Sequence, residues 1–191
     1  MSMTRAQAET VLKLLIPKVK TLFYGAGNEF TMAGMTVVPS VVIEPGNFPD
    51  AVPAVVGENI GVGVTQLLLD VADDTAIRFA LAHELGHGFS ETVLAKIGMQ
   101  GASGAVTEVI ADLGSAYLLT QVGVGWQGIL HAVDDWRTSQ IFTAGWSGDH
   151  PPGDQRATYV HSLFSLMSAQ GFNRSFEAAA RLICNNLKQK N

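Results

Sequence analysis

The run from Thr75 to about Leu94 constrains the fold more than any other stretch, because it has helical periodicity and contains the pentapeptide His-Glu-Leu-Gly-His. Asp73 and Asp74 stand where a helix N-cap belongs. Residues four apart on a helix lie about 40° apart around its axis, so His83 and His87 project toward one point from adjacent turns. This spacing can chelate one metal ion, and only roughly 0.005 HExxH matches are expected by chance in such a composition.

The other residues of this pattern predict the ligand set of the metal. Glu84 lies beside the first histidine and can reach a metal-held water without being a ligand, which is the arrangement of HExxH zinc peptidases. A catalytic zinc takes three protein ligands and one open position. A third histidine at position 93 is excluded, since Val93 stands there. The alternative is a glutamate from a following helix, and Glu108 lies 21 residues after His87.

Glu108 begins the segment Glu-Val-Ile-Ala-Asp, which ends at Asp112. A helix returning antiparallel to the first would bring Glu108 against the metal and let Asp112 accept the outer N–H of a ligand histidine. Such a carboxylate fixes the histidine tautomer and raises its basicity. Gly86 and Gly88 each cost a helix up to about 1 kcal/mol relative to alanine. Two explanations stay open, namely close packing of the Glu108 helix at Gly86 and a helix that Gly88 weakens or ends.

Other periodicities predict the remaining elements. We expect an amphipathic helix over residues 1–20, a turn at 24–28, a strand at 35–44 whose centre Pro39 makes an edge or a bulge, and a loop at 46–57. A second strand is expected at 59–65, where Gly61 and Gly63 leave one face nearly bare to a close approach. Further helices are expected at 105–121, 126–136, 154–168 and 175–188, with a loop at 137–152.

Composition excludes several classes of protein. A chain of 191 residues, 47% hydrophobic and 15% charged, is expected to form a single domain over residues 1–191. The net charge of -5 and the lack of a Lys/Arg cluster argue against nucleic acid as a partner. No signal peptide or apolar run of about 20 residues is visible, so we expect no membrane span and a protein that is cytoplasmic as synthesised, with export by a non-classical route left open. Cys184 is expected to be a packed residue, and His131 and His161 to be structural or surface residues.

The segment LAHELGH at 81–87, together with EVIAD at 108–112, resembles the gluzincin family of HtpX-type, Oma-type and CAAX prenyl proteases. The segment IGVGVTQLL at 60–68 is similar to that family's strand before the active-site helix. His150-Pro151 followed by Arg156 resembles its HP…R motif. The resemblance covers about residues 58–165.

This resemblance implies an α+β, mainly helical, zincin-like metallopeptidase fold with a small β-sheet whose edge strand borders the active-site cleft. It implies that an extended peptide pairs with Ile60, Gly61, Val62 and Gly63. His150 would lie near the zinc, either stabilising the oxyanion or capping the metal in a latent state. Arg156 would hold that loop by a salt bridge.

The expected function is that of a zinc-dependent endopeptidase acting on peptides or unfolded proteins, with one Zn²⁺ held by His83, His87 and Glu108 and with Glu84 as general base. Two alternatives remain. One is a latent or inactive zinc-binding interaction module, and the other is a delivered effector or toxin peptidase that acts in another compartment. The sequence leaves cleavage specificity and oligomeric state open.

Overall fold

The computed structural model describes residues 2–25, 27–138, 153–168 and 175–188. The protein is α+β and mainly helical, with a small mixed sheet. Its elements are α1 (Arg5–Val19), η1 (Lys20–Tyr24), β1 (Thr31–Met32), β2 (Met35–Glu44), β3 (Ala51–Val56), β4 (Asn59–Thr65), α2 (Gln66–Val71), α3 (Asp74–Lys96), α4 (Gly104–Gln121), α5 (Trp126–Thr138), α6 (Gly153–Ser168) and α7 (Phe176–Lys188).

Local signals in the sequence account for the helix starts. Thr4 and Gln7 form a capping box at α1, and the side chain of Asp73 accepts a hydrogen bond from the backbone N–H of Ala76 at the start of α3. The α3 helix runs through to Lys96 without a break, and Gly98, with φ 72°, follows its end. Of the two explanations for its glycines, the one in which Gly88 ends the helix is therefore wrong.

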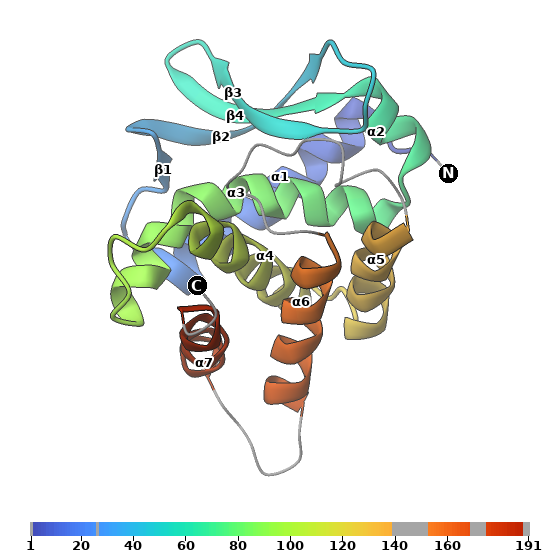
Figure 1. The fold of residues 1–191 in the computed structure, drawn as a ribbon. Coiled ribbons are helices and arrows are strands. Elements are labelled where there is room, and N and C mark those ends of the chain that lie inside the picture. The colour runs from blue at the N-terminus through green and yellow to red at the C-terminus, as the bar shows by residue number, and fades with distance from the viewer. Residues whose placement is uncertain (1, 26, 139–152, 169–174, 189–191) are drawn as a thin grey trace.

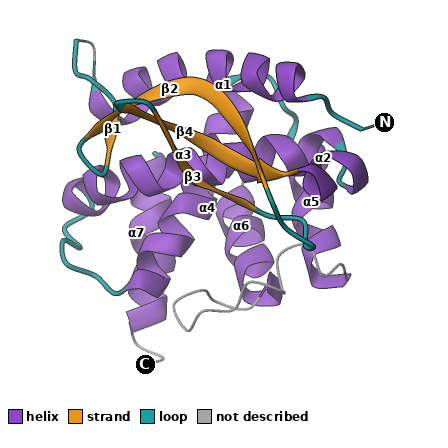
Figure 2. Ribbon diagram, turned by 90° about the horizontal axis from the view of Figure 1, so that it is seen from above, coloured by secondary structure: helices purple, strands orange, loops and turns teal. Residues whose placement is uncertain are grey.

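The sheet lies on one side of the molecule, above α1 and α3 (Figures 1 and 2). Its strand order is β1-β2-β4-β3, with β2 and β4 parallel and the other two pairs antiparallel. β2 packs on α1, while β3 packs on α3. The register between β2 and β4 shifts between Val37 and Val41, which is the bulge that Pro39 predicts.

The expected loop at 46–57 is wrong in its second half, because Ala51–Val56 forms strand β3. A two-residue turn joins β3 to β4, and Gly57 in it has φ 61°. Pro53 is compatible with this strand because the outer edge of β3 is unpaired among the described residues, so that no ladder hydrogen bond is lost there.

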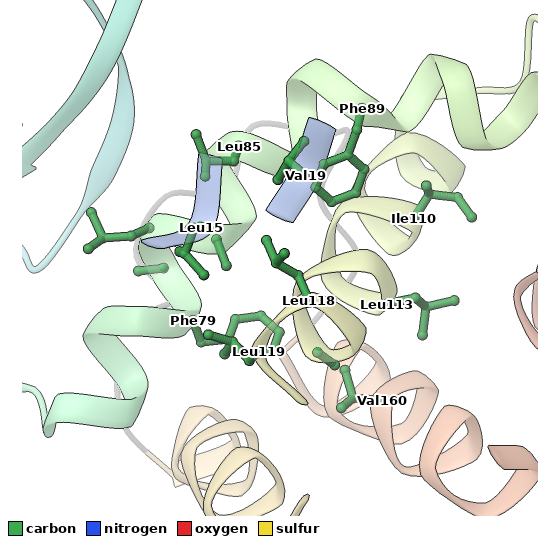
Figure 3. Packing of buried hydrophobic residues seen from close by; sticks show 14 of the residues in the cluster. Leu15, Val19, Phe79, Leu85, Phe89, Ile110, Leu113, Leu118, Leu119 and Val160 are labelled. Carbon is green, nitrogen blue, oxygen red and sulfur yellow. The ribbon is translucent and has the colours of Figure 1, made fainter. Parts of the chain in front are cut away.

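The helix α3 lies at the centre of the molecule, between the sheet and the remaining helices (Figure 1). Figure 3 shows part of the core around it, where apolar side chains of α1, α3, α4 and α6 meet, among them Leu15, Phe79, Phe89, Leu113 and Val160. Burial of these side chains on all sides fixes the position of α3. Within the described ranges, no helix has the length and apolar character that a membrane crossing requires.

The α3 and α4 helices approach closely where two small residues meet. A Cβ atom built on Gly86 would stand 2.7 Å from the Cβ of Ala111, and one on Gly88 would stand 2.6 Å from the ring of Phe30. Real Cβ atoms essentially never come so near. Gly86 faces the backbone and Cβ of Ala111, so this helix spacing requires glycine there, whereas a Cβ at Gly88 would require the ring of Phe30 to shift. The close-packing explanation of Gly86 is the one that the structure supports, and it determines how near α4 can carry its side chains to those of α3.

Candidate metal centre

Two turns of α3 bring three polar side chains to the face that meets α4 and the sheet. His83 and Glu84 are buried, and the side chain of His87 is 26% exposed. The two imidazole rings lie 4.8 Å apart between centroids, with their planes at 84°. His83, Glu84 and His87 can each offer one ligand atom within 4.8 Å of the others. The HExxH spacing thus converges on one point, as the helical geometry requires.

Glu108 enters from α4, directly across from these residues. Its Oε2 atom lies 3.3 Å from His83 Nε2, and its Oε1 atom lies 3.8 Å from His87 Nδ1. The carboxylate is buried, so these imidazoles are part of the environment that solvates it. The helix pair therefore brings together the three residues that the sequence predicts as ligands, and either imidazole nitrogen can bind a metal.

Asp112 lies one turn further along α4 and is fully buried. Its Oδ1 atom is 2.9 Å from His83 Nδ1. With Nδ1–H donating to this carboxylate, Nε2 of the same ring faces Glu108 and is the nitrogen that could bind a metal once it has lost its proton. This is the position that the sequence predicts for Asp112.

Arg156 reaches the same carboxylate from α6. Its Nε atom donates to Asp112 Oδ2 at 2.7 Å, and its Nη2 atom donates to Asp112 Oδ1 at 2.7 Å. Both side chains are buried, so this is a two-pronged ion pair removed from solvent. The sequence predicts a salt bridge between Arg156 and the preceding loop, which includes His150. That loop lies outside the described residues. The pairing with Asp112 was not predicted, because no local pattern relates positions 112 and 156.

Charges in the centre shift its pKa values in opposite directions. Burial raises the pKa of Glu84 to about 8, with the Glu108 and Asp50 carboxylates adding to the rise and the His83 charge opposing it. Burial alone would lower the pKa of His83, but hydrogen bonds to Asp112 and Glu108 raise it to about 9. For Asp112 the effect of burial is outweighed by the charge and hydrogen bonds of Arg156, which hold its pKa well below its usual range.

Asp50 also contributes to the electrostatics around Glu84, and no sequence pattern indicates this role. It immediately precedes β3, where its backbone N–H donates to Thr65 Oγ1 and its carbonyl accepts from the Thr65 N–H. These bonds hold the start of β3 beside the end of β4, with the Asp50 charge near enough to raise the pKa of Glu84. The start of the edge strand therefore lies close to the candidate metal centre.

The expectation that β4 is the sheet edge open to a peptide is wrong. β4 is an inner strand, paired with β2 on one side and β3 on the other, so the backbone of Ile60, Gly61, Val62 and Gly63 is engaged within the sheet. The space beside its glycines is filled by atoms of β2. A Cβ on Gly61 would stand 2.4 Å from the Ser40 carbonyl oxygen, and one on Gly63 would stand 2.7 Å from the side chain of Glu44. The edge strand beside α3 is β3 instead.

The two histidines that were expected to be structural or surface residues belong to other parts of the molecule. His161 lies 2.9 Å from Asp134, which joins α6 to α5. His131 is exposed on α5 and lies 3.8 Å from Asp135.

Comparison of this chain with models of known protein families gives no match, and no curated protein or solved structure matches it.

Proposed function

We propose that this protein is a zinc-dependent endopeptidase in which His83, His87 and Glu108 hold the metal. The observation that carries the proposal is the convergence of these three side chains, with Glu108 at 3.3 Å from one imidazole and 3.8 Å from the other. Two neutral nitrogen donors and one carboxylate are the donor set of catalytic zinc sites that keep a fourth position open. The charge of a bound cation would also offset the two buried carboxylates, Glu84 and Glu108.

Zinc bound there would supply Lewis acidity, which polarises a carbonyl and makes water more acidic. Glu84 is the proton carrier in this scheme. Its carboxylate lies 3.9 Å from His87 on the same helix face, where it takes a proton from the attacking water and then gives it to the departing amine nitrogen. Asp112 keeps the His83 ring in one tautomer, and Arg156 keeps Asp112 ionised.

An extended polypeptide would lie between α3 and the outer edge of β3. This substrate class is favoured by two features: among the described residues the outer edge of β3 has no partner strand, and β3 packs against α3, the helix that carries Glu84. The same features support an endopeptidase, since a strand can continue past the site in both directions.

The experiment that tests the proposal compares the wild type with Glu84→Gln, using carboxymethylated casein as an unfolded substrate and plasma mass spectrometry for zinc. The expected result is cleavage by the zinc-loaded wild type, and no cleavage by a variant that still holds zinc, because the amide keeps the shape of Glu84 but cannot take up a proton from water and release it. Full activity in zinc-loaded Glu84→Gln would refute the role of Glu84. A zinc-loaded wild type that leaves casein intact would favour the interaction-module alternative.

A further inference from the structure

The outer edge of β3 presents more hydrogen-bond acceptors than donors. In an antiparallel pair, successive residues alternate between bonding to the partner strand and pointing away from it. The N–H of Thr65 donates to the carbonyl of Asp50, so position 50 faces β4. The register of β3 and β4 continues without a break from Ala51 to Val56. Ala51, Pro53 and Val55 therefore direct their backbone groups away from the sheet.

Most of the donors on this edge are absent or already used. Pro53 has no N–H. The N–H of Ala51 donates to the Asp50 carboxylate, with N to Oδ1 at 2.9 Å. Within the ranges that the structure describes, the carbonyl oxygens of Ala51, Pro53 and Val55 and the N–H of Val55 face outward and have no partner strand. Val55 is 66% exposed as a residue, and within the described ranges no strand pairs with this edge.

We infer that β3 is an acceptor edge, which selects extended polypeptides by the N–H groups that they present at alternate residues. A substrate strand beside it donates to the carbonyls of Ala51, Pro53 and Val55, and finds one backbone donor for its own carbonyls in return. Proline or any N-alkylated residue at a facing position of the substrate loses one of these bonds. Pro53 and Asp50 are thus specificity-determining residues, and the inference rests on the proposed function only for the nature of the occupant.

The test measures binding separately from cleavage. Overlapping decapeptides of casein are titrated by fluorescence anisotropy against zinc-loaded Glu84→Gln, and the tightest binder is then resynthesised with a single backbone N-methyl group at each position in turn. The expected result is a loss of about two- to tenfold in affinity at every second residue of the bound stretch, and little change at the residues between. A uniform response, or none, would overturn the inference, as would a set of decapeptides that does not bind.

A second test changes the protein instead of the peptide. Pro53→Ala in the same background adds an N–H to the edge and is expected to tighten binding by about two- to tenfold. The matched control is Pro45→Ala, which removes a proline from an exposed loop position and adds nothing to the strand edge. Equal affinities for Pro53→Ala and its parent would overturn the inference. Cleavage of the same peptide by the wild type is scored separately: alternating binding without cleavage refutes the peptidase alone, and cleavage without alternation refutes the acceptor edge alone.

Discussion

Replacing Arg156 by methionine should both destabilise the fold and weaken zinc binding at the candidate metal centre. The guanidinium makes two hydrogen bonds of 2.7 Å to Asp112, and the side chains of Arg156 and Asp112 are 5% and 0% exposed. Removing one partner of a buried ion pair leaves an uncompensated charge, at a cost of about 3–5 kcal/mol. Methionine fills much of the same volume, so the cavity term is small and the lost charge dominates.

The loss is measured as the change in the free energy of unfolding in urea, followed by circular dichroism at neutral pH on metal-free protein. The matched control is Arg78→Met, which breaks the Arg78–Asp74 pair on the surface of α3, where the side chains are 30% and 60% exposed. An exposed pair of this kind contributes about 0–1 kcal/mol. We expect the two substitutions to differ by at least about 2 kcal/mol.

The same variants are titrated with zinc against a competing chelator. Arg156→Met should weaken zinc binding by about 10- to 100-fold, because Asp112 then no longer holds the His83 ring in one orientation, whereas Arg78→Met should leave it unchanged. If Arg156→Met unfolds at the urea concentration of the control and binds zinc as tightly, the reasoning from the buried pair is refuted.

We expect the wild type to copurify with zinc and Glu108→Ala to lose most of it, as measured by plasma mass spectrometry; retention of stoichiometric zinc in the variant would mean that the third ligand is another residue. Gly86→Ala should destabilise the protein by about 1–3 kcal/mol, because its methyl group would stand 2.7 Å from that of Ala111. Gly128→Ala, where the nearest atom is 3.8 Å away, should instead be neutral or stabilising in the same urea titration. In metal-free protein the raised pKa of His83 stabilises the fold below about 6.5, and this contribution is lost as the pH rises through about 9. The free energy of unfolding should therefore fall across that window in the wild type by more than it falls in His83→Gln.

The helices are the part of the fold that the sequence predicts best, because their signals are local. Asp73 caps α3 as expected, and the bounds of the predicted helices differ from those observed by few residues. The uncertainty at Gly86 and Gly88 could not be resolved locally, since what offsets their poor helix propensity is contact with Ala111 and Phe30 in other elements.

The sheet was predicted less well, for the same physical reason. Pro53 argues locally against a strand, so the sequence indicates a loop where β3 forms. Whether the nitrogen of Pro53 faces a partner strand or an open edge depends on pairing that no local pattern encodes. The inner position of β4 did have a signal. Ile60–Thr65 is apolar or glycine at nearly every position, which suits a strand that is covered on both sides better than one that borders a cleft.

In the candidate site, too, the residues that local geometry relates are predicted, and those that only the tertiary fold brings together are not. His83, Glu84 and His87 follow from helix geometry alone, and Glu108 and Asp112 from the assumption that α4 returns beside α3. Arg156 could not be connected to Asp112 in advance, since the two are 44 residues apart. Asp50 stands alone before a short strand, and only the folded chain brings its charge near Glu84.

The candidate metal centre is built from two helices that follow one another in the sequence, and this affects the order in which its residues are made during synthesis. His83 and Asp112 are only 29 residues apart, and His83, His87, Glu108 and Asp112 are all synthesised before α6. At about 5–20 residues per second, Arg156 follows Asp112 by roughly 2–9 s. During that interval the nascent helical hairpin carries carboxylates whose guanidinium partner has not yet been made. A metal ion captured then would act as the first counter-charge, and we expect zinc supplied during translation to raise the yield of folded protein more than zinc added after the chain is released.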